Sequence, residues 1–108
     1  MTTTSATAPS DIPHPASEEL DLAAVLHALS DPVRLEIVAG LAGGDERTCG
    51  SFDVAVTKST CTHHFRVLRE AGLIRQRQQG TMRLNSLRRD DLEARFPGLL
   101  GTILKAAA

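Results

Sequence analysis

The sequence predicts a mainly α-helical domain with one small β-hairpin, in the order four helices, hairpin, helix. Apolar residues recur at helical spacing both before residue 73 and after residue 88. Between these segments they alternate with polar residues around a glycine turn, which indicates two short strands. With 108 residues, 42% of them hydrophobic, the chain can build one packed domain around a single core.

Residues 1–17 are expected to form a disordered N-terminal arm, because they are polar, contain several prolines and offer almost nothing to bury. They lack the basic flank and apolar stretch of a secretory signal, and no apolar run in the chain is long enough to span a membrane. Two cysteines in such a chain suit reduced thiols. We therefore expect a cytoplasmic protein whose folded domain covers residues 18–106.

Two helices open the predicted domain. The first, over 18–29, buries one apolar stripe. Its members are Leu22, Val25, Leu26 and Leu29. The second begins at Asp31-Pro32, which supplies an N-cap and a proline at the first helical position, and it ends at Gly43-Gly44. The expected buried positions of the second helix are Leu35, Val38 and Leu41.

Two further helices follow. Thr48 is expected to cap a short third helix over 48–56, and Thr57 to cap a fourth over 58–71 that ends at Gly72. At ~100° per residue, one side of the fourth helix is apolar and must face the core. That side holds Cys61, Phe65, Leu68 and Gly72. The opposite side presents Ser59, Thr62, His63 and Arg66, with Lys58 at its exposed start.

Residues 73–85 predict a two-stranded hairpin around a Gln79-Gly80 turn. Its inward residues are expected to be Ile74, Met82 and Leu84, and its other face to carry Arg75, Arg77 and Arg83. The tail of the chain is expected to be helical, with a break near Pro97.

Basic residues are concentrated in the fourth helix and the hairpin. Residues 58–89 carry a net charge of +7, whereas residues 1–57 carry −7 and the whole chain −1. Such asymmetry is typical of a segment that contacts nucleic acid. Hydroxyl groups on the fourth helix can reach base edges or phosphates, and Arg66 can bind guanine with two hydrogen bonds. An arginine of the hairpin can follow the backbone or enter the minor groove.

The segments Leu29–Leu41 (LSDPVRLEIVAGL) and His63–Ile74 (HHFRVLREAGLI) resemble the second helix and the recognition helix of the ArsR/SmtB family of small bacterial repressors. The resemblance covers about residues 20–87. It implies a winged helix-turn-helix fold that binds double-stranded DNA at a pseudo-palindromic operator, with helix 58–71 in the major groove and the wing 73–85 beside it. It also implies a homodimer built largely from the terminal helices.

The expected DNA contacts combine the wheel, the resemblance and the wing. They are Lys58, Ser59, Thr60, Thr62, His63, Arg66, Arg75, Arg77, Gln79 and Arg83. Thr60 rests on the resemblance alone, because it lies to one side of the wheel. The expected dimer contacts are Leu22, Leu26, Leu99, Leu100, Ile103 and Leu104.

The sequence departs from the family at its known metal sites. Where many relatives carry a Cys-Val-Cys box, this chain has Thr48, Cys49 and Gly50, and its last helix contains no histidine. No resident metal or cofactor is therefore expected. An alternative is a metal- or thiol-responsive sensor, because Cys61 and His64 lie three residues apart and Cys49 can approach them. Burial as ordinary core residues is the competing interpretation.

The sequence does not predict an enzyme. It contains no glycine-rich phosphate loop, no nucleophile elbow and no histidine–carboxylate constellation. A second alternative is a winged helix that binds an acidic protein, since a fold alone never decides function. A protein-binding face would more often present exposed apolar anchors, whereas the outer side of helix 58–71 is polar. The effector, if any, and the operator are not specified by the sequence.

Overall fold

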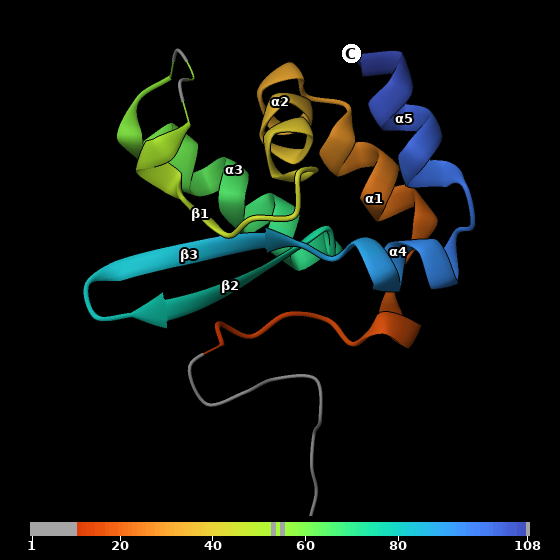
Figure 1. Cartoon of the computed structure of the whole chain (residues 1–108), viewed down its shortest axis with the longest axis horizontal. Helices are drawn as coiled ribbons and strands as arrows, with labels where there is room; N and C mark the ends of the chain where they lie inside the picture. The colour runs from red at the N-terminus through yellow and green to blue at the C-terminus, as the bar shows by residue number, and fades with distance from the viewer. Residues whose placement is uncertain (1–10, 53, 55, 108) are drawn as a thin grey trace, which may run out of the picture.

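The computed structural model describes residues 11–52, 54 and 56–107. In chain order its elements are the 3-10 turn η1 (Ser17–Glu19), α1 (Leu22–Leu29), α2 (Pro32–Leu41), β1 (Arg47–Thr48), the 3-10 turn η2 (Cys49–Ser51), α3 (Lys58–Ala71), β2 (Ile74–Gln79), β3 (Met82–Leu87), α4 (Arg89–Arg95) and α5 (Leu99–Ala107). Helices α1, α2, α3 and α5 lie together on one side of the hairpin (Figure 1). In the described part of the chain, no helix is long and apolar enough to cross a membrane.

Short local signals decide where the helices begin and end. Asp31 Oδ1 accepts hydrogen bonds from the backbone N–H groups of Val33 (2.8 Å) and Arg34 (3.1 Å) at the start of α2. Thr57 Oγ1 accepts one from Thr60 N (3.2 Å) at the start of α3. Helix α3 ends at Gly72, whose φ is 90° and whose surroundings leave no room for a Cβ beside Leu20. The predicted caps of both helices are confirmed.

The predicted break in the tail is also confirmed. Helix α4 ends before Pro97, and Gly98 adopts a φ of 81° before α5 begins. Proline cannot continue the hydrogen bonding of a helix, and the glycine allows the left-handed turn that follows. Helix α5 can therefore fold back, so that Leu100 reaches the core.

One apolar core joins the helices to the base of the hairpin. Its members are Leu20, Val25, Ala28, Leu29, Ile37, Val38, Leu41, Phe65, Leu68, Leu73, Ile74, Leu92 and Leu100. The predicted stripe of the first helix is half wrong, because Leu22 and Leu26 are 46% and 44% exposed. On α2, Ile37 is buried and the predicted Leu35 only partly so. Leu100 is 3% exposed and belongs to the core, so one protomer leaves little of this side chain for the predicted dimer contact.

The third helix predicted over 48–56 is wrong for the residues described there. Thr48 instead pairs with Leu84 of β3 as part of β1, and only the single turn η2 follows. Phe52 then packs on Phe65 with ring centroids 5.6 Å apart, beneath the guanidinium of Arg47 at 4.0 Å. These contacts with β3 and α3 override a weak local helix preference.

The hairpin is confirmed, but its two faces differ from the prediction. Strands β2 and β3 are joined by Gly80-Thr81, so that Gln79 pairs with Met82 and Gln78 with Arg83. A two-residue loop pairs even-numbered positions with odd-numbered ones, so residues of equal parity on the two strands lie on opposite faces. Arg83 therefore shares a face with Ile74, while Met82 and Leu84 share the other with Arg75 and Arg77.

The expectation of disorder does not hold for residues 11–17; residues 1–10 lie outside the described part. Asp11 forms an antiparallel bridge with Arg77, and Ile12 N donates to Gln76 O at 2.8 Å. Arg88 Nη1 holds Pro15 O at 2.7 Å. The free edge of β2 offers unpaired backbone groups, and this segment satisfies one of them at Gln76.

Candidate nucleic-acid interface

The outer side of α3 is a continuous polar face. All of its predicted residues are exposed, namely Lys58, Ser59, Thr60, Thr62, His63 and Arg66. Thr62 Oγ1 donates to Lys58 O (3.0 Å), and Thr57 Oγ1 donates to Thr60 Oγ1 (2.9 Å). Each of these hydroxyl groups keeps further hydrogen-bonding capacity toward solvent. The face therefore presents hydroxyls, an imidazole and cations on one rigid helix.

The inner side of α3 anchors this face. Phe65 and Leu68 are 1% and 0% exposed and belong to the core. The predicted inward position of Cys61 is only half-buried. Because the apolar side is held against α1 and α2, the exposed side has a fixed orientation relative to the rest of the domain.

A buried polar contact adds to this anchoring. Arg34 Nη1 lies 3.1 Å from His64 Nδ1, and Arg34 Nε donates to Ala28 O at 2.6 Å. A guanidinium can only donate, so His64 Nδ1 accepts and the ring proton resides on Nε2. Nε2 lies 4.0 Å from Asp31 Oδ1. His64 thus joins α3 to the start of α2, which suits a structural role.

The predicted wing arginines divide into two groups. Arg77 donates to both carboxylate oxygens of Glu46, at 2.7 and 2.8 Å, and Arg75 Nε lies 3.9 Å from Asp11 Oδ2. The hydrogen bond from Arg77 lowers the pKa of Glu46 below its ordinary value, and the same bond raises the pKa of Arg77. These two arginines are partly neutralised on the outer face, while Arg83 lies on the face toward α3.

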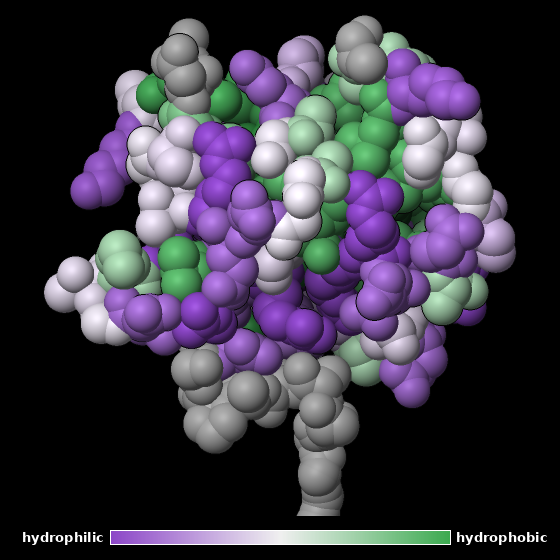
Figure 2. All heavy atoms as spheres, in the orientation of Figure 1, coloured by the Kyte–Doolittle hydropathy of each residue, from purple (hydrophilic) through white to green (hydrophobic). Residues whose placement is uncertain are grey.

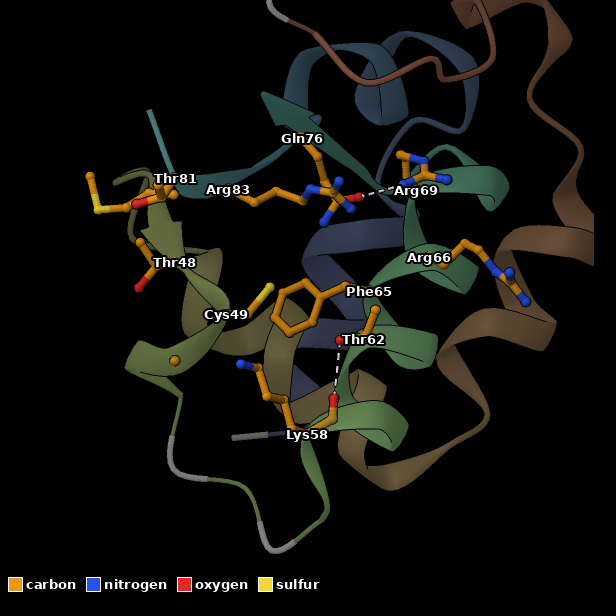
Figure 3. A pocket seen from close by; sticks show the side chains of 12 residues that line it. Thr48, Cys49, Lys58, Thr62, Phe65, Arg66, Arg69, Gln76, Thr81 and Arg83 are labelled. Atoms are coloured by element: carbon orange, nitrogen blue, oxygen red, sulfur yellow. Dashed lines mark hydrogen bonds between the residues drawn. The ribbon is translucent and has the colours of Figure 1, made fainter. Parts of the chain in front are cut away.

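An open groove of about 590 Å³ lies between α3, η2 and the hairpin (Figure 3). Cations line it from both sides: Lys58, Arg66 and Arg69 from α3, and Arg83 from β3. Figure 3 shows Arg83 and Arg69 reaching from opposite walls toward Gln76. The structure thus brings Lys58, Thr62 and Arg66 together with Arg83 in the groove, but not with Arg75 or Arg77. The other predicted α3 residues, Ser59, Thr60 and His63, are exposed outside it.

Three residues of this region were missed by the sequence analysis, namely Arg69, Gln76 and Asn85. Arg69 Nη1 donates to Gln76 Oε1 (2.8 Å), and Gln76 Nε2 donates to Asn85 Oδ1 (2.7 Å). Sequence signals pointed to two of them, Arg69 and Gln76. Arg69 follows Arg66 by one helical turn, and Gln76 is two residues from the buried Ile74 on the same strand face.

The three candidate sensor residues do not form one site, although Cys49 and Cys61 lie on the same cavity. His64 is engaged with Arg34 and Asp31, and among the described residues no three potential metal ligands lie together. Cys49 and Cys61 are free thiols on one cavity of about 310 Å³. Burial raises the pKa of Cys61, and the nearby Cys49 adds to this, so Cys61 favours its protonated, less nucleophilic form.

Comparison with known proteins places this arrangement in a family. A model of a helix-turn-helix domain matches residues 29–77. The uncharacterized HTH-type transcriptional regulator YceK of Bacillus subtilis (strain 168) is 37% identical over 90 residues, which span 81% of this chain and 90% of the relative. The chain belongs to the HTH-type transcriptional regulators.

This HTH-type regulator also resembles a solved structure, that of the transcriptional repressor BigR from Xylella fastidiosa. The TM-score is 0.57 and the identity 27%, over 69% of this chain and 85% of that chain. The likeness confirms the predicted winged helix-turn-helix fold, with β2 and β3 as its wing. The matched helix-turn-helix region of the regulator runs from the last residue of α1 into β2 and includes all of α3.

Proposed function

We propose that this regulator is an ArsR/SmtB-type repressor that acts in the bacterial cytoplasm and binds double-stranded DNA as a homodimer. One observation carries the proposal: the exposed hydroxyl, imidazole and guanidinium groups of α3 stand beside a groove lined by cations from helix and wing. Such a surface matches a major groove and its flanking phosphates. Repression is inferred from the resemblance in sequence and from BigR, which is described as a repressor.

In this proposal α3 enters the major groove with its N-terminal half foremost. Arg66 and His63 face base edges, while short hydroxyl groups and Lys58 contact bases or phosphates. On the wing, Arg83 would contact the DNA backbone from the face toward α3, and the exposed Gln79 from the end of the hairpin. Arg75 and Arg77 contribute only where phosphates displace Asp11 and Glu46 from them.

The proposed dimer surface is the exposed side of α1 together with α5. Leu22 and Leu26 are the large apolar residues left most exposed on α1, and Leu99, Ile103 and Leu104 of α5 are only partly buried. Figure 2 shows apolar surface gathered over α1 and its neighbours, whereas the strands below are mostly polar, apart from apolar atoms near the end of the hairpin. Pairing two copies here would cover these side chains and set two α3 helices about one DNA turn, roughly 34 Å, apart.

A salt-dependent anisotropy titration against DNA from upstream of the protein's own gene tests the proposal, with scrambled DNA of equal length as control. We expect binding that discriminates by about 10³-fold or more at physiological salt. Equal affinity for both DNAs at every salt concentration would contradict specific regulation at that locus. Absence of binding even at low salt would favour a winged helix that binds another protein. A pull-down would then identify that protein partner.

A further inference from the structure

The groove between α3 and the wing has an unbalanced charge. Lys58, Arg66, Arg69 and Arg83 line it, and no carboxylate stands among the lining residues that the structure describes. One acid lies beside Arg69: Glu70 Oε2 is 3.9 Å from Arg69 Nη2, but the Glu70 side chain is 65% exposed. A water-exposed carboxylate at this distance compensates a partly buried cation weakly.

Arg69 is the most buried of these four cations, since the other three are exposed. Its side chain is 14% exposed, and its Nε–H finds no hydrogen-bond partner among the described residues. Burial lowers the pKa of Arg69, and the nearby Arg83 and Arg66 lower it further, while Glu70 opposes them. A guanidinium has five N–H donors, and only one of those on Arg69 is used by Gln76. The guanidinium of Arg69 is therefore held in place while some of its N–H groups can still donate to a ligand.

A directed chain of buried amides holds Arg69 in this position. Gln76 and Asn85 are 1% and 0% exposed, so their polar atoms must be paired inside the protein. Gln76 accepts from Arg69 and donates to Asn85, which in turn donates to Arg47 O at 3.0 Å. The chain crosses from α3 through β2 and β3 to β1. It joins the recognition helix to the wing and fixes the direction in which Arg69 points.

A ligand with several anionic oxygens would complete this arrangement. Two arginines that face the same space repel each other unless an anion lies between them, and guanidinium groups bind phosphate oxygens with paired hydrogen bonds. The groove adjoins the exposed side of α3, since Thr62 and Arg66 belong to both. A DNA duplex on that side would bring its backbone to the groove.

We propose that Arg69 and Arg83 bind one phosphodiester of the DNA backbone between the recognition helix and the wing, with Gln76 as the positioning residue. This inference rests on the DNA binding proposed above. Because both arginines contact the same phosphate, the wing and the recognition helix are fixed on the same turn of DNA. Arg69 is a contact that the exposed face of α3 does not include.

The test compares Arg69→Gln, Arg83→Gln and Arg89→Gln with the wild type on the wild type's preferred DNA. Arg89 is exposed, lies outside the groove and donates to Ala42 O, so its variant matches the loss of charge. We expect the slope of log K against log salt to become shallower by about 0.9 in each groove variant, because one phosphate contact is lost. The slope should stay unchanged in Arg89→Gln. Arg83 is exposed, so Arg83→Gln keeps the test valid if Arg69→Gln folds poorly.

Ethylation interference locates the contact. Modification of one phosphate should weaken binding of the wild type but not of Arg69→Gln, while interference at all other phosphates persists. Gln76→Met should lose the same single phosphate although Arg69 is intact, and combining it with Arg69→Gln should cause no further loss. Unchanged slopes and interference patterns in both arginine variants would overturn the inference.

A second arm separates this site from DNA binding as such. The free protein is titrated with inorganic phosphate, and the arginine Nε–Hε signals are followed by NMR. Shifts that vanish in Arg69→Gln support the anion site; if the wild type binds no DNA, they assign the site to a free oxyanion and contradict the proposed function alone. Absence of any shift, together with unchanged DNA slopes, overturns the site alone.

Discussion

Arg77 of the wing is bound by Glu46 through two parallel hydrogen bonds, from Nε to Oε2 at 2.7 Å and from Nη2 to Oε1 at 2.8 Å. The two residues are 31 positions apart in the chain, and both side chains remain about one-third exposed. The carboxylate occupies the edge of the guanidinium that a DNA phosphate would use. In the proposed complex with DNA, Glu46 would therefore compete with a phosphate for this wing arginine.

Replacing Glu46 with glutamine should free Arg77 for DNA. We expect tighter binding to all DNA sequences and a salt slope steeper by about 0.9, because one more phosphate contact becomes possible. Asp45→Asn is the matched control, since it removes the same charge from the same loop without touching Arg77. Equal changes in the two variants, measured by anisotropy, would mean that only the overall charge matters.

The Glu46–Arg77 pair also predicts a pH dependence. The pKa of Glu46 is lowered in the folded protein, so the stabilisation is complete above the ordinary carboxyl pKa and is lost as pH falls through the lowered one. Acid unfolding of Glu46→Gln should therefore show a smaller drop in stability over that acidic range than the wild type. A parallel decline in both proteins would show that the pair contributes nothing to acid sensitivity.

Arg66→Ala should weaken binding to a specific site by about 1–3 kcal/mol if Arg66 contacts a base, because a bidentate contact to guanine is lost. The loss should be much smaller on scrambled DNA. Arg89→Ala removes an exposed arginine outside the interface and should leave both affinities nearly unchanged. An equal loss on specific and scrambled DNA would reassign Arg66 to a phosphate.

Leu26→Asp should break the proposed dimer. Leu26 is 44% exposed in the protomer, so the aspartate is tolerated by the folded chain but not by an apolar interface. Sedimentation should give a monomer, and operator affinity should fall by roughly 100-fold because two half-sites are no longer linked. Met82→Asp, at a 47% exposed position on the wing, should leave the mass unchanged. A dimeric Leu26→Asp would place the interface elsewhere.

His64→Ala should lower the free energy of unfolding by about 1–3 kcal/mol, because a buried N–H of Arg34 loses its acceptor. His64→Asn is the informative comparison, since Asn Oδ1 can accept near the position of His Nδ1 and should restore part of the loss. Urea unfolding measures both variants. Equal stability of the alanine and asparagine variants would show that the contact with Arg34 contributes little.

Most of the helical scaffold was predictable, because the deciding signals are local. The caps at Asp31 and Thr57, the ending at Gly72 and the break at Pro97 each depend on a few neighbouring residues. The exposed side of α3 followed from the same kind of information. A helix with Phe65 and Leu68 inward leaves no other orientation for Thr62 and Arg66.

The structure of the wing was less predictable, because it depends on pairing between strands. A strand pattern predicts alternation within each strand, but the face that Arg83 shares with β2 depends on the loop at Gly80-Thr81. The helix expected after Thr48 was lost for a similar reason. Pairing with Leu84 and the stacking of Phe52 on Phe65 are contacts with distant segments.

The sequence by itself determined where most of the helices and the hairpin lie and which side of α3 faces outward, since caps, glycines and apolar periodicity act over a few residues. Only the tertiary structure decided which arginines are paired with acids and which line the groove. Arg75 and Arg77 meet Asp11 and Glu46, whereas Arg69 and Arg83 meet each other across a groove. The strength of the interaction between two charged groups depends on the distance between them. Charged residues far apart in the chain come close only when strands and helices pack.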